Sequence, residues 1–288
     1  MAERDTEIER VEKIVRRLKV NVIKMLAISG GGHAGGSMSI AEIIGVLYFH
    51  VMRINPDNPL DKDRDRFILS KGHACATLYA ALSEIGFIPE NVLWTLHHIG
   101  SPLQMHPERE TCPGVEISTG ALGQGLSAGV GMAIGAKIRK KAFRTYVLLG
   151  DGELDEGQVW EAIMSASKFR LDNLVAIVDY NRFSLTSSTS ETMPLDPIVD
   201  KWSSFGWHII EVDGHNLSQL FGAFDKAAGT KDRPTVIIAN TVKGHDIPAY
   251  AGKAESHSVS FTAKEVQETL LGLGCPNDEV NLTISKMN

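Results

Sequence analysis

The first 28 residues carry a helical pattern. Apolar side chains recur at three- and four-residue steps between charged ones, which predicts an amphipathic helix that ends near Ile28. The following cluster, Gly30 to Gly36, contains His33 and is too rich in glycine for a regular element. We therefore expect a flexible loop that carries His33, followed by a second apolar helix from Ser39 to about Arg53.

A second histidine follows a short apolar run. Residues 64–70 are typical of a turn that leads into a strand at Phe67 to Leu69, and Lys71-Gly72-His73 comes next. A helical stretch from about Ala74 to Ile85 follows. His73 is therefore expected at the end of a strand, next to glycine.

From residue 145 onward, continuous apolar runs of strand length alternate with helical segments. The runs are residues 146–149, 174–178, 208–212 and 236–239, and the clearest helices are Gly157 to Lys168 and Leu217 to Ala228. This alternation predicts an α/β fold in which helices cover both faces of a parallel sheet. We expect a single domain over residues 1–288, in which residues 262–288 form a C-terminal helix and tail.

Composition narrows the class of protein. With 288 residues, 43% hydrophobic and 22% charged, the chain can bury a large globular core. The net charge of -6 and the lack of a basic run argue against a nucleic-acid partner. The cysteines, Cys75, Cys112 and Cys275, show neither a disulfide pattern nor zinc spacing, and we find neither a signal peptide nor an apolar run of membrane-spanning length. We expect a cytoplasmic protein with no membrane partner.

Polar residues beside glycine follow the predicted strands. They stand at residues 150–152, 179–181, 213–215 and 241–245. Ligands of open parallel sheets bind outside the carboxyl ends of the strands, although any one of these segments could simply turn the chain or cap a helix. Asp151 and Asn181 lie one strand-helix-strand unit apart, so they would project from adjacent strands. Their carboxylate and amide oxygens suit a hard cation such as Mg²⁺.

These segments resemble the thiamine diphosphate-binding half of transketolases. The similarity extends from about Asn21 to His257, with the motifs in the family's order. The motifs are Ser29 to Met38, Arg64 to His73, His106-Pro107, Pro113 to Glu116, Gly120 to Gly125, and Gly150 to Glu156 followed by Asn181. The resemblance implies the thiamine diphosphate-binding α/β fold and a transferase of carbohydrate metabolism.

The resemblance also implies how the cofactor is held. Asp151, Asn181 and the main-chain oxygen of Phe183 would bind a divalent metal, which is Mg²⁺ or another cation such as Ca²⁺ or Mn²⁺. The residues expected to contact thiamine diphosphate are Gly152, Asn181, His73 and His257 at or near the diphosphate and thiazolium, with Gly120 and Leu122 beside the aminopyrimidine.

The catalytic residues implied by the resemblance are four histidines and a glutamate. His33, His73 and His106 would line the cleft near the thiazolium, and His257 would approach the diphosphate and the donor sugar. Glu156 would belong to a carboxylate network that links two active sites in a dimer. Neutral imidazoles can donate to a developing alkoxide and later accept a proton, which suits the transfer of a two-carbon ketol unit from a ketose or ketose phosphate to an aldose. The cofactor supplies the electron sink.

The resemblance covers only the diphosphate-binding half of a transketolase. We therefore expect this chain to be the amino-terminal subunit of a split transketolase, inactive without a second chain that carries the pyrimidine-binding and C-terminal domains. An α2β2 heterotetramer is the expected assembly. The glycines of segment 120–135 would allow close packing either at that interface or within this domain.

Other functions fit parts of the sequence. Gly123-Gln124-Gly125, after a possible strand at Val115 to Ser118, imitates the fingerprint of a nicotinamide-dependent oxidoreductase. The α subunit of a 2-oxoacid dehydrogenase has a similar split architecture and the same cofactor. A non-catalytic subunit that retains the fold is a third alternative.

Overall fold

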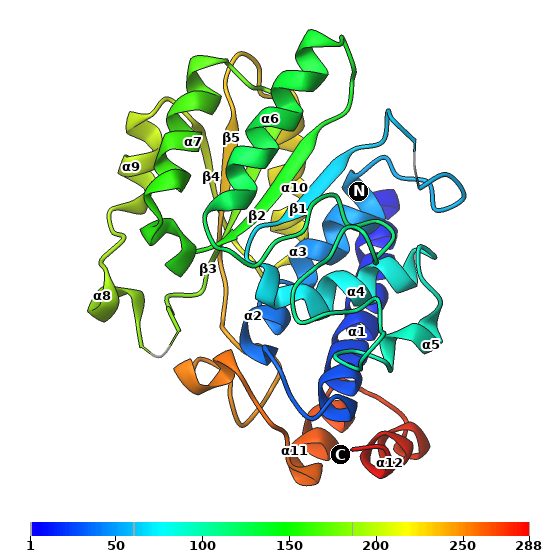
Figure 1. Ribbon diagram of the computed structural model, residues 1–288. Helices are drawn as coiled ribbons and strands as arrows, with labels where there is room; N and C mark the ends of the chain where they lie inside the picture. The colour runs from blue at the N-terminus through cyan, green and yellow to red at the C-terminus, as the bar shows by residue number, and fades with distance from the viewer. Residues whose placement is uncertain (1, 60, 186, 288) are drawn as a thin grey trace.

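A parallel five-stranded sheet forms the centre of the computed structural model, which describes residues 2–59, 61–185 and 187–287 (Figure 1). The strand order is β1-β2-β3-β5-β4, and every neighbouring pair is parallel. The strands are β1 (Arg66–Leu69), β2 (Thr145–Gly150), β3 (Leu174–Tyr180), β4 (His208–Asp213) and β5 (Thr235–Asn240). All five predicted strands are therefore confirmed.

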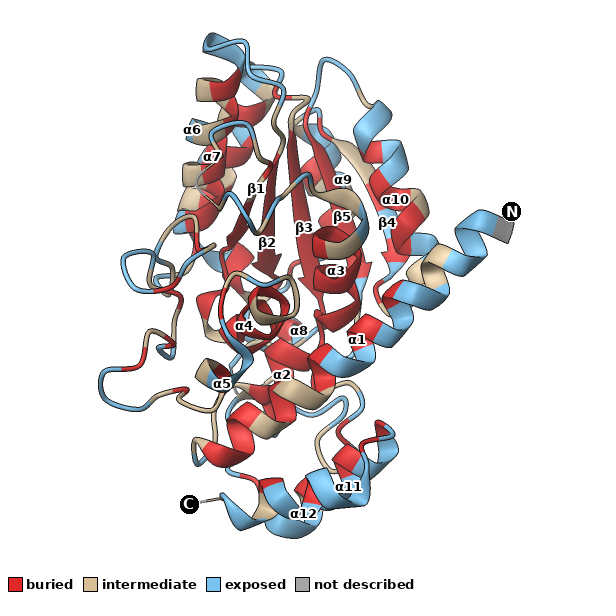
Figure 2. Cartoon of the chain, turned by 90° about the vertical axis from the view of Figure 1, so that its right-hand side faces the viewer, coloured by how far each residue is buried: buried red, intermediate tan, exposed pale blue. Residues whose placement is uncertain are grey.

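Helices cover both faces of the sheet. Alternate strand residues enter two separate cores: Val175 and Ile177 of β3 face one layer, whereas Ala176 and Val178 face the other. The first layer contains α1 (Ala2–Ile28), α3 (Ala41–Val46), α4 (Cys75–Glu84) and α10 (Leu217–Gly229); the second contains α6 (Gln124–Ile138), α7 (Gly157–Lys168) and α9 (Ile198–Ser204). Figure 2 shows the buried sheet between α6 and α7 on one side and α1, α3 and α10 on the other. The predicted α/β architecture is confirmed.

The glycine cluster is more regular than its composition predicts. A short helix, α2 (Ala34–Met38), includes Gly35 and Gly36 and is buried throughout. A Cβ atom at Gly35 would lie 2.4 Å from the Ser256 hydroxyl oxygen, so this glycine permits a close contact. The predicted loop is wrong for residues 34–36. The next predicted helix, from Ser39 to about Arg53, is divided into α3 (Ala41–Val46) and a π-helical turn, Leu47–Val51.

The C-terminal segment contains two helices where one helix and a tail are predicted. They are α11 (Ala263–Gly272) and α12 (Asn277–Ser285). Gly274, with a φ of 77°, turns the chain after α11, and Pro276 precedes the first residue of α12. Short α-helices also occur at α5 (Glu90–Leu93) and α8 (Thr189–Thr192), with 3₁₀ turns at Gly72–Ala74, Gly152–Asp155 and Ala254–His257.

The structure divides the glycines of α6 into two groups. A Cβ atom at Gly125 would lie 2.4 Å from Ser70 Oγ, and one at Gly129 would lie 2.4 Å from Val147 Cγ2, so both permit close packing within this domain. Beside Gly131 and Gly135 there is open space.

Two further expectations can be compared with the fold. Residues 115–118 form no strand, so the possible strand before Gly123 is wrong and the apparent nicotinamide fingerprint lacks its strand. Within residues 2–59, 61–185 and 187–287, no helix is both long enough and apolar enough to cross a membrane.

Candidate functional site

A cavity of about 310 Å³ opens where β2 and β3 end. Asp151 follows β2 and Asn181 follows β3, and β2 is paired with β3 along its whole length. Both side chains line this cavity, as the strand ends predict. Of the residues predicted for the site, Glu156 is the exception: it is exposed and does not line the cavity.

The predicted histidines converge here from four separate segments. The ring centroid of His33 lies 5.3 Å from that of His73, 6.3 Å from that of His106 and 5.2 Å from that of His257. His73 and His257 are also 5.2 Å apart. All four line the cavity, together with Gly120 and Leu122. The arrangement therefore unites residues that are up to 224 positions apart along the chain (257 − 33).

A small bridge between distant segments places His33 beside His257. Gly32 and Val259 exchange backbone hydrogen bonds of 2.9 Å in each direction. A Cβ atom on Gly31, whose φ is 130°, would lie 2.5 Å from the carbonyl oxygen of Val259. Glycine is required there because the conformation is strained for other residues and the two backbones approach closely.

Partial burial keeps the imidazoles neutral. Burial, and then the neighbouring Lys71 ammonium, lowers the pKa of His73 to about 2. Burial and the Lys243 ammonium lower the pKa of His257 to about 4, and burial also lowers the pKa values of His33 and His106. Near neutral pH each ring therefore offers one donor and one acceptor to the cavity.

The candidate metal ligands are held in place by backbone hydrogen bonds. Asp151 Oδ1 accepts from the Gly152 N–H at 2.9 Å, and Asp151 Oδ2 accepts from the Arg182 N–H. Asn181 Oδ1 accepts from the Phe183 N–H at 3.0 Å, and Asn181 Nδ2 donates to Asp179. Because carboxylate and amide oxygens each have two lone pairs, these contacts leave acceptor capacity on both side chains.

The donor set fits a divalent cation that prefers oxygen. Asp151 is 1% exposed, and its burial, together with the nearby Asp179 carboxylate, raises its pKa to about 7. A buried carboxylate with a raised pKa lacks sufficient positive charge around it, which a bound cation would supply. Carboxylate and amide oxygens, with the main-chain oxygen of Phe183 nearby, are the ligands that Mg²⁺, Ca²⁺ and Mn²⁺ prefer.

The sequence reasoning missed a buried ion pair behind the histidines. Lys71 Nζ lies 2.5 Å from Asp179 Oδ2 and donates to the carbonyl oxygen of Gly36 at 2.9 Å. Asp179 also accepts from Ser39 at 2.7 Å and from Thr241. Lys71 follows β1 and Asp179 lies near the end of β3. The sequence shows both positions but not that the two side chains meet, because their pairing depends on the tertiary fold.

Two other cavity residues were also missed. Lys243 Nζ donates to the carbonyl oxygen of Ser184 at 2.7 Å, and burial lowers its pKa to about 8. Glu153 accepts from the backbone N–H groups of Gly123 at 2.8 Å and Gly150 at 3.1 Å, which fixes the start of α6 against the end of β2. The cavity thus has cationic side chains as well as the proposed metal ligands.

Some residues of the family-like motifs serve the fold instead of the cavity. Arg64 and Arg66 both pair with Glu116, and the side chain of Arg64 is only 10% exposed. Asp65 accepts from the backbone N–H groups of Arg53 and Arg144 at 2.8 Å each. These contacts join the start of β1 to the preceding and following segments.

The family of the chain follows from its similarity to known proteins. Residues 9–285 match the family described as "Transketolase, thiamine diphosphate binding domain". The chain belongs to the transketolase family. Human transketolase is 42% identical over 252 residues, which are 87% of this chain but 40% of the human protein. The predicted resemblance is therefore confirmed, and this chain corresponds to the thiamine diphosphate-binding half of the longer transketolases.

Two transketolase relatives have nearly the same length as this chain. A 6-deoxy-6-sulfo-D-fructose transketolase subunit from Clostridium sp. is 41% identical over 262 residues, covering 91% of this chain and 94% of the relative. An apulose-4-phosphate transketolase subunit from Phocaeicola vulgatus is 39% identical over 264 residues, covering 92% and 94%. Relatives that are themselves subunits support the prediction of a split transketolase.

Solved transketolases share the fold. The structure of transketolase from Pichia stipitis in complex with sedoheptulose-7-phosphate superposes with a TM-score of 0.88 at 29% identity. The match covers 97% of this chain and 44% of that protein. Transketolase from Leishmania mexicana gives a TM-score of 0.87 at 30% identity, with 96% and 44% covered. This chain therefore spans less than half the length of these solved transketolases.

Proposed function

We propose that this chain is the amino-terminal subunit of a split transketolase, which transfers a two-carbon ketol unit from a ketose or ketose phosphate to an aldose. The observation that carries the proposal is the convergence of His33, His73, His106 and His257 in the cavity that Asp151 and Asn181 also line. The alternative function, a nicotinamide-dependent oxidoreductase, does not explain why these four histidines lie together.

We propose that the cavity holds thiamine diphosphate and a divalent metal, which we take to be Mg²⁺. Asp151, Asn181 and the main-chain oxygen of Phe183 would hold the metal, Gly152 would contact the diphosphate, and the cation of Lys243 would offset its charge. When bound, the cofactor supplies the electron sink for carbon-carbon bond cleavage next to a carbonyl group.

The histidines would orient the sugar and move its protons. A neutral imidazole can donate to an oxygen that gains negative charge and can accept a proton from a hydroxyl group. The lowered pKa values of His73 and His257 support hydrogen bonding to the sugar, because they keep both rings neutral at physiological pH. Gly120 and Leu122 would flank the aminopyrimidine, and Glu156 would act between two active sites in an assembled dimer.

The assembly that we propose contains a second chain. That chain would carry the pyrimidine-binding and C-terminal domains, and the complex would be an α2β2 heterotetramer. We further propose that residues 1–288 form one diphosphate-binding domain, which the single sheet shared by both cores supports. A cytoplasmic location agrees with the free cysteines Cys75, Cys112 and Cys275.

The substrates that we propose are sugars or sugar phosphates. The two subunit relatives carry different sugars in their names, 6-deoxy-6-sulfo-D-fructose and apulose-4-phosphate. Similar transketolase subunits are therefore named for different sugars, and the substrate of this chain has to be determined by experiment.

Reconstitution tests the proposed function. The chain is mixed with its complementary subunit, thiamine diphosphate and Mg²⁺, and ketol transfer from a panel of ketoses and ketose phosphates is followed by detection of the aldose released. We expect activity in the mixture and none from either chain alone. Asp151→Asn should remove activity while the complex still forms. Full activity of this chain without a partner would contradict the split assembly.

A further inference from the structure

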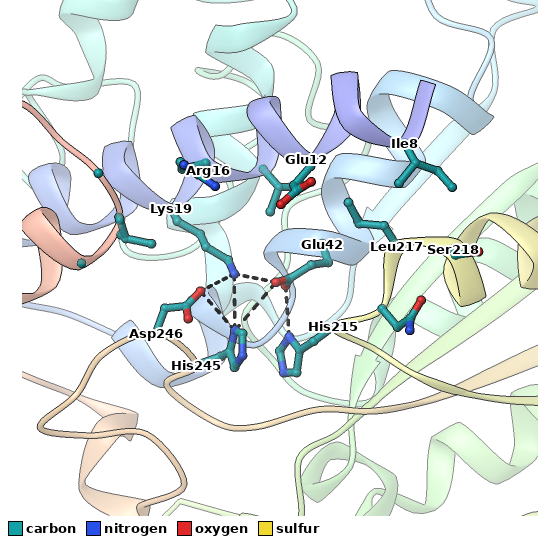
Figure 3. A pocket seen from close by; sticks show the side chains of 15 residues that line it. Ile8, Glu12, Arg16, Lys19, Glu42, His215, Leu217, Ser218, His245 and Asp246 are labelled. Atoms are coloured by element: carbon teal, nitrogen blue, oxygen red, sulfur yellow. Dashed lines mark hydrogen bonds and ion pairs between the residues drawn. The ribbon is translucent and has the colours of Figure 1, made fainter. Parts of the chain in front are cut away.

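A second cavity, of about 640 Å³, contains a cluster of charged and imidazole side chains (Figure 3). It lies between α1, the start of α10 and the turn that follows β5. The cluster consists of Lys19 from α1, Glu42 from α3, His215 after β4, and His245 and Asp246 after β5. None of these residues lines the cavity of the proposed active site.

Lys19 is the centre of the cluster. Its Nζ lies 2.5 Å from Glu42 Oε1, 2.5 Å from Asp246 Oδ2 and 3.3 Å from His245 Nδ1. The side chains of Lys19 and Glu42 are each only 6% exposed. Pairing with Glu42 and Asp246 outweighs burial and raises the pKa of Lys19, so the ammonium keeps its charge.

The cluster resembles a metal site, but its cation is the lysine. Ligand atoms of Glu42, His215 and His245 lie within 4.8 Å of one another. However, the Lys19 ammonium already bridges the carboxylates of Glu42 and Asp246. Both nitrogens of His215 are also engaged, because Nε2 accepts from the Val242 N–H at 2.8 Å and Nδ1 lies 3.2 Å from Glu42 Oε2. A metal ion would have to displace these contacts.

The cluster holds both ends of one turn. At one end, the Val242 N–H donates to His215; at the other, Asp246 pairs with Lys19. Glu42 joins the two, since it contacts both His215 and Lys19. Lys243 lies between these ends, and its side chain lines the proposed cofactor cavity, where it donates to the carbonyl oxygen of Ser184.

The backbone of this turn needs such support. Asp246 has a φ of 63°, in the left-handed region that residues other than glycine rarely adopt. Such conformations persist when surrounding contacts determine them. The ion pair between Asp246 and Lys19 is one such contact, and the hydrogen bond from Gly244 N–H to the Gly35 carbonyl oxygen, at 3.0 Å, is another.

We propose that Lys19, Glu42, His215 and Asp246 are positioning residues that fix the turn from Val242 to Asp246, so that Lys243 faces the bound diphosphate. The link to the diphosphate rests on the proposed function. The link to the turn rests on the contacts above and can be tested separately. Lys19 acts as the internal cation of the cluster.

A pair of substitutions at His215 tests the first end of the turn. His215→Leu removes the acceptor of the Val242 N–H, whereas the amide oxygen of His215→Gln can replace it. We expect faster hydrogen-deuterium exchange of residues 241–247 in His215→Leu. Its affinity for thiamine diphosphate with Mg²⁺ should fall about tenfold, as for one charge-assisted hydrogen bond. His215→Gln should restore both properties.

A substitution at Asp246 tests the other end of the turn. Asp246 is exposed, so we do not expect its substitution to unfold the protein. Asp246→Asn removes the ion pair with Lys19 but keeps a residue that tolerates the left-handed conformation. The matched control is Asp225→Asn, because Asp225, on α10 and away from the turn, forms an exposed ion pair with Arg4. Asp246→Asn should raise exchange and weaken cofactor binding, and Asp225→Asn should change neither.

The two measurements separate the possible outcomes. The role of the cluster would be overturned if hydrogen-deuterium exchange of residues 241–247 were unchanged in both His215→Leu and Asp246→Asn. It would also be overturned if exchange rose as much in His215→Gln as in His215→Leu. Raised exchange with unchanged cofactor affinity would overturn its link to Lys243. If thiamine diphosphate binds neither to the unmodified chain nor to its complex with the complementary subunit, the proposed function fails, whereas the exchange data still decide whether the cluster fixes the turn.

Discussion

At the scale of single residues, the site depends on charges that are buried behind the histidines. Lys71 and Asp179 are 2% and 0% exposed, and each makes several hydrogen bonds to neighbouring groups. Asp179 also accepts from Asn181, a proposed metal ligand, at 2.8 Å. The pair therefore connects the segment that carries His73 to the end of β3.

Breaking this pair should destabilise the fold strongly. Lys71→Met leaves the Asp179 carboxylate buried without its partner, and such changes cost about 3–5 kcal/mol. The free energy of unfolding, measured by urea denaturation, should fall by that amount. The double variant Lys71→Met/Asp179→Leu should recover much of the loss, because both charges are then absent. An unchanged denaturation midpoint for Lys71→Met would show that the pair contributes little.

The histidines should make stability fall in mild acid. The pKa values of His73 and His257 are lowered from 6.5 to about 2 and about 4 in the folded state. The unfolded chain therefore takes up protons near pH 6.5 that the folded chain does not, so stability present above that pH is lost as the pH falls towards 4. Thermal unfolding between pH 7 and 4 should show this decline, and it should be smaller in His257→Gln. An identical pH dependence in that variant would contradict the lowered pKa of His257.

At the scale of elements, α6 shows how glycines with the same sequence pattern serve different purposes. Gly129 faces the buried side chain of Val147 on β2, whereas Gly131 faces open space. Both lie in the same helix, and the sequence alone left packing within the domain and packing at an interface as alternatives. In the structure, Gly129 packs within the domain, whereas the space beside Gly131 is open to a partner chain.

Alanine substitutions distinguish these two glycines. Gly129→Ala should destabilise the isolated chain by about 1–3 kcal/mol, because the new methyl group overpacks the contact with Val147. Gly131→Ala should stabilise it by roughly 0.5–1 kcal/mol through the better helix propensity of alanine. Chemical denaturation of both variants checks this prediction. A stabilising Gly129→Ala would mean that α6 does not pack closely on β2.

The strands were predictable because buried parallel strands are continuous apolar runs. The extent of α7 was also predictable, since apolar side chains recur at helical steps between Gly157 and Lys168. The path of residues 34–36 was not, because the contact between Gly35 and Ser256 depends on a segment more than 200 residues away. Likewise, α12 escaped prediction because its apolar positions are few.

The site was predictable where its residues stand in recognisable motifs. Asp151 and Asn181 follow adjacent strands, and the histidines lie in segments that resemble the family. Lys243 and Glu153 stand equally close to strand ends, but nothing in the sequence shows that their side chains turn into the same cavity. Their partners, Ser184 for the first and Gly123 for the second, are set by the fold.

At the scale of the whole molecule, the candidate site gathers residues from almost the full length of the chain. His33 lies near the start and His257 near the end, and the bridge between Gly32 and Val259 joins their segments. The proposed metal and diphosphate contacts all belong to this chain, whereas catalysis would need the second chain. We therefore expect this chain to bind the metal and the diphosphate end of the cofactor without the partner.

The most direct test is the titration of thiamine diphosphate into the isolated chain by isothermal calorimetry. We predict binding with Mg²⁺, loss of binding with excess chelator, and at least about a hundredfold weaker binding in Asp151→Asn, equivalent to about 2.7 kcal/mol. Titration with NAD serves as the control and should give no heat of binding. Binding that persists without a divalent cation and in Asp151→Asn, or binding of NAD in its place, would contradict the assignment of this cavity.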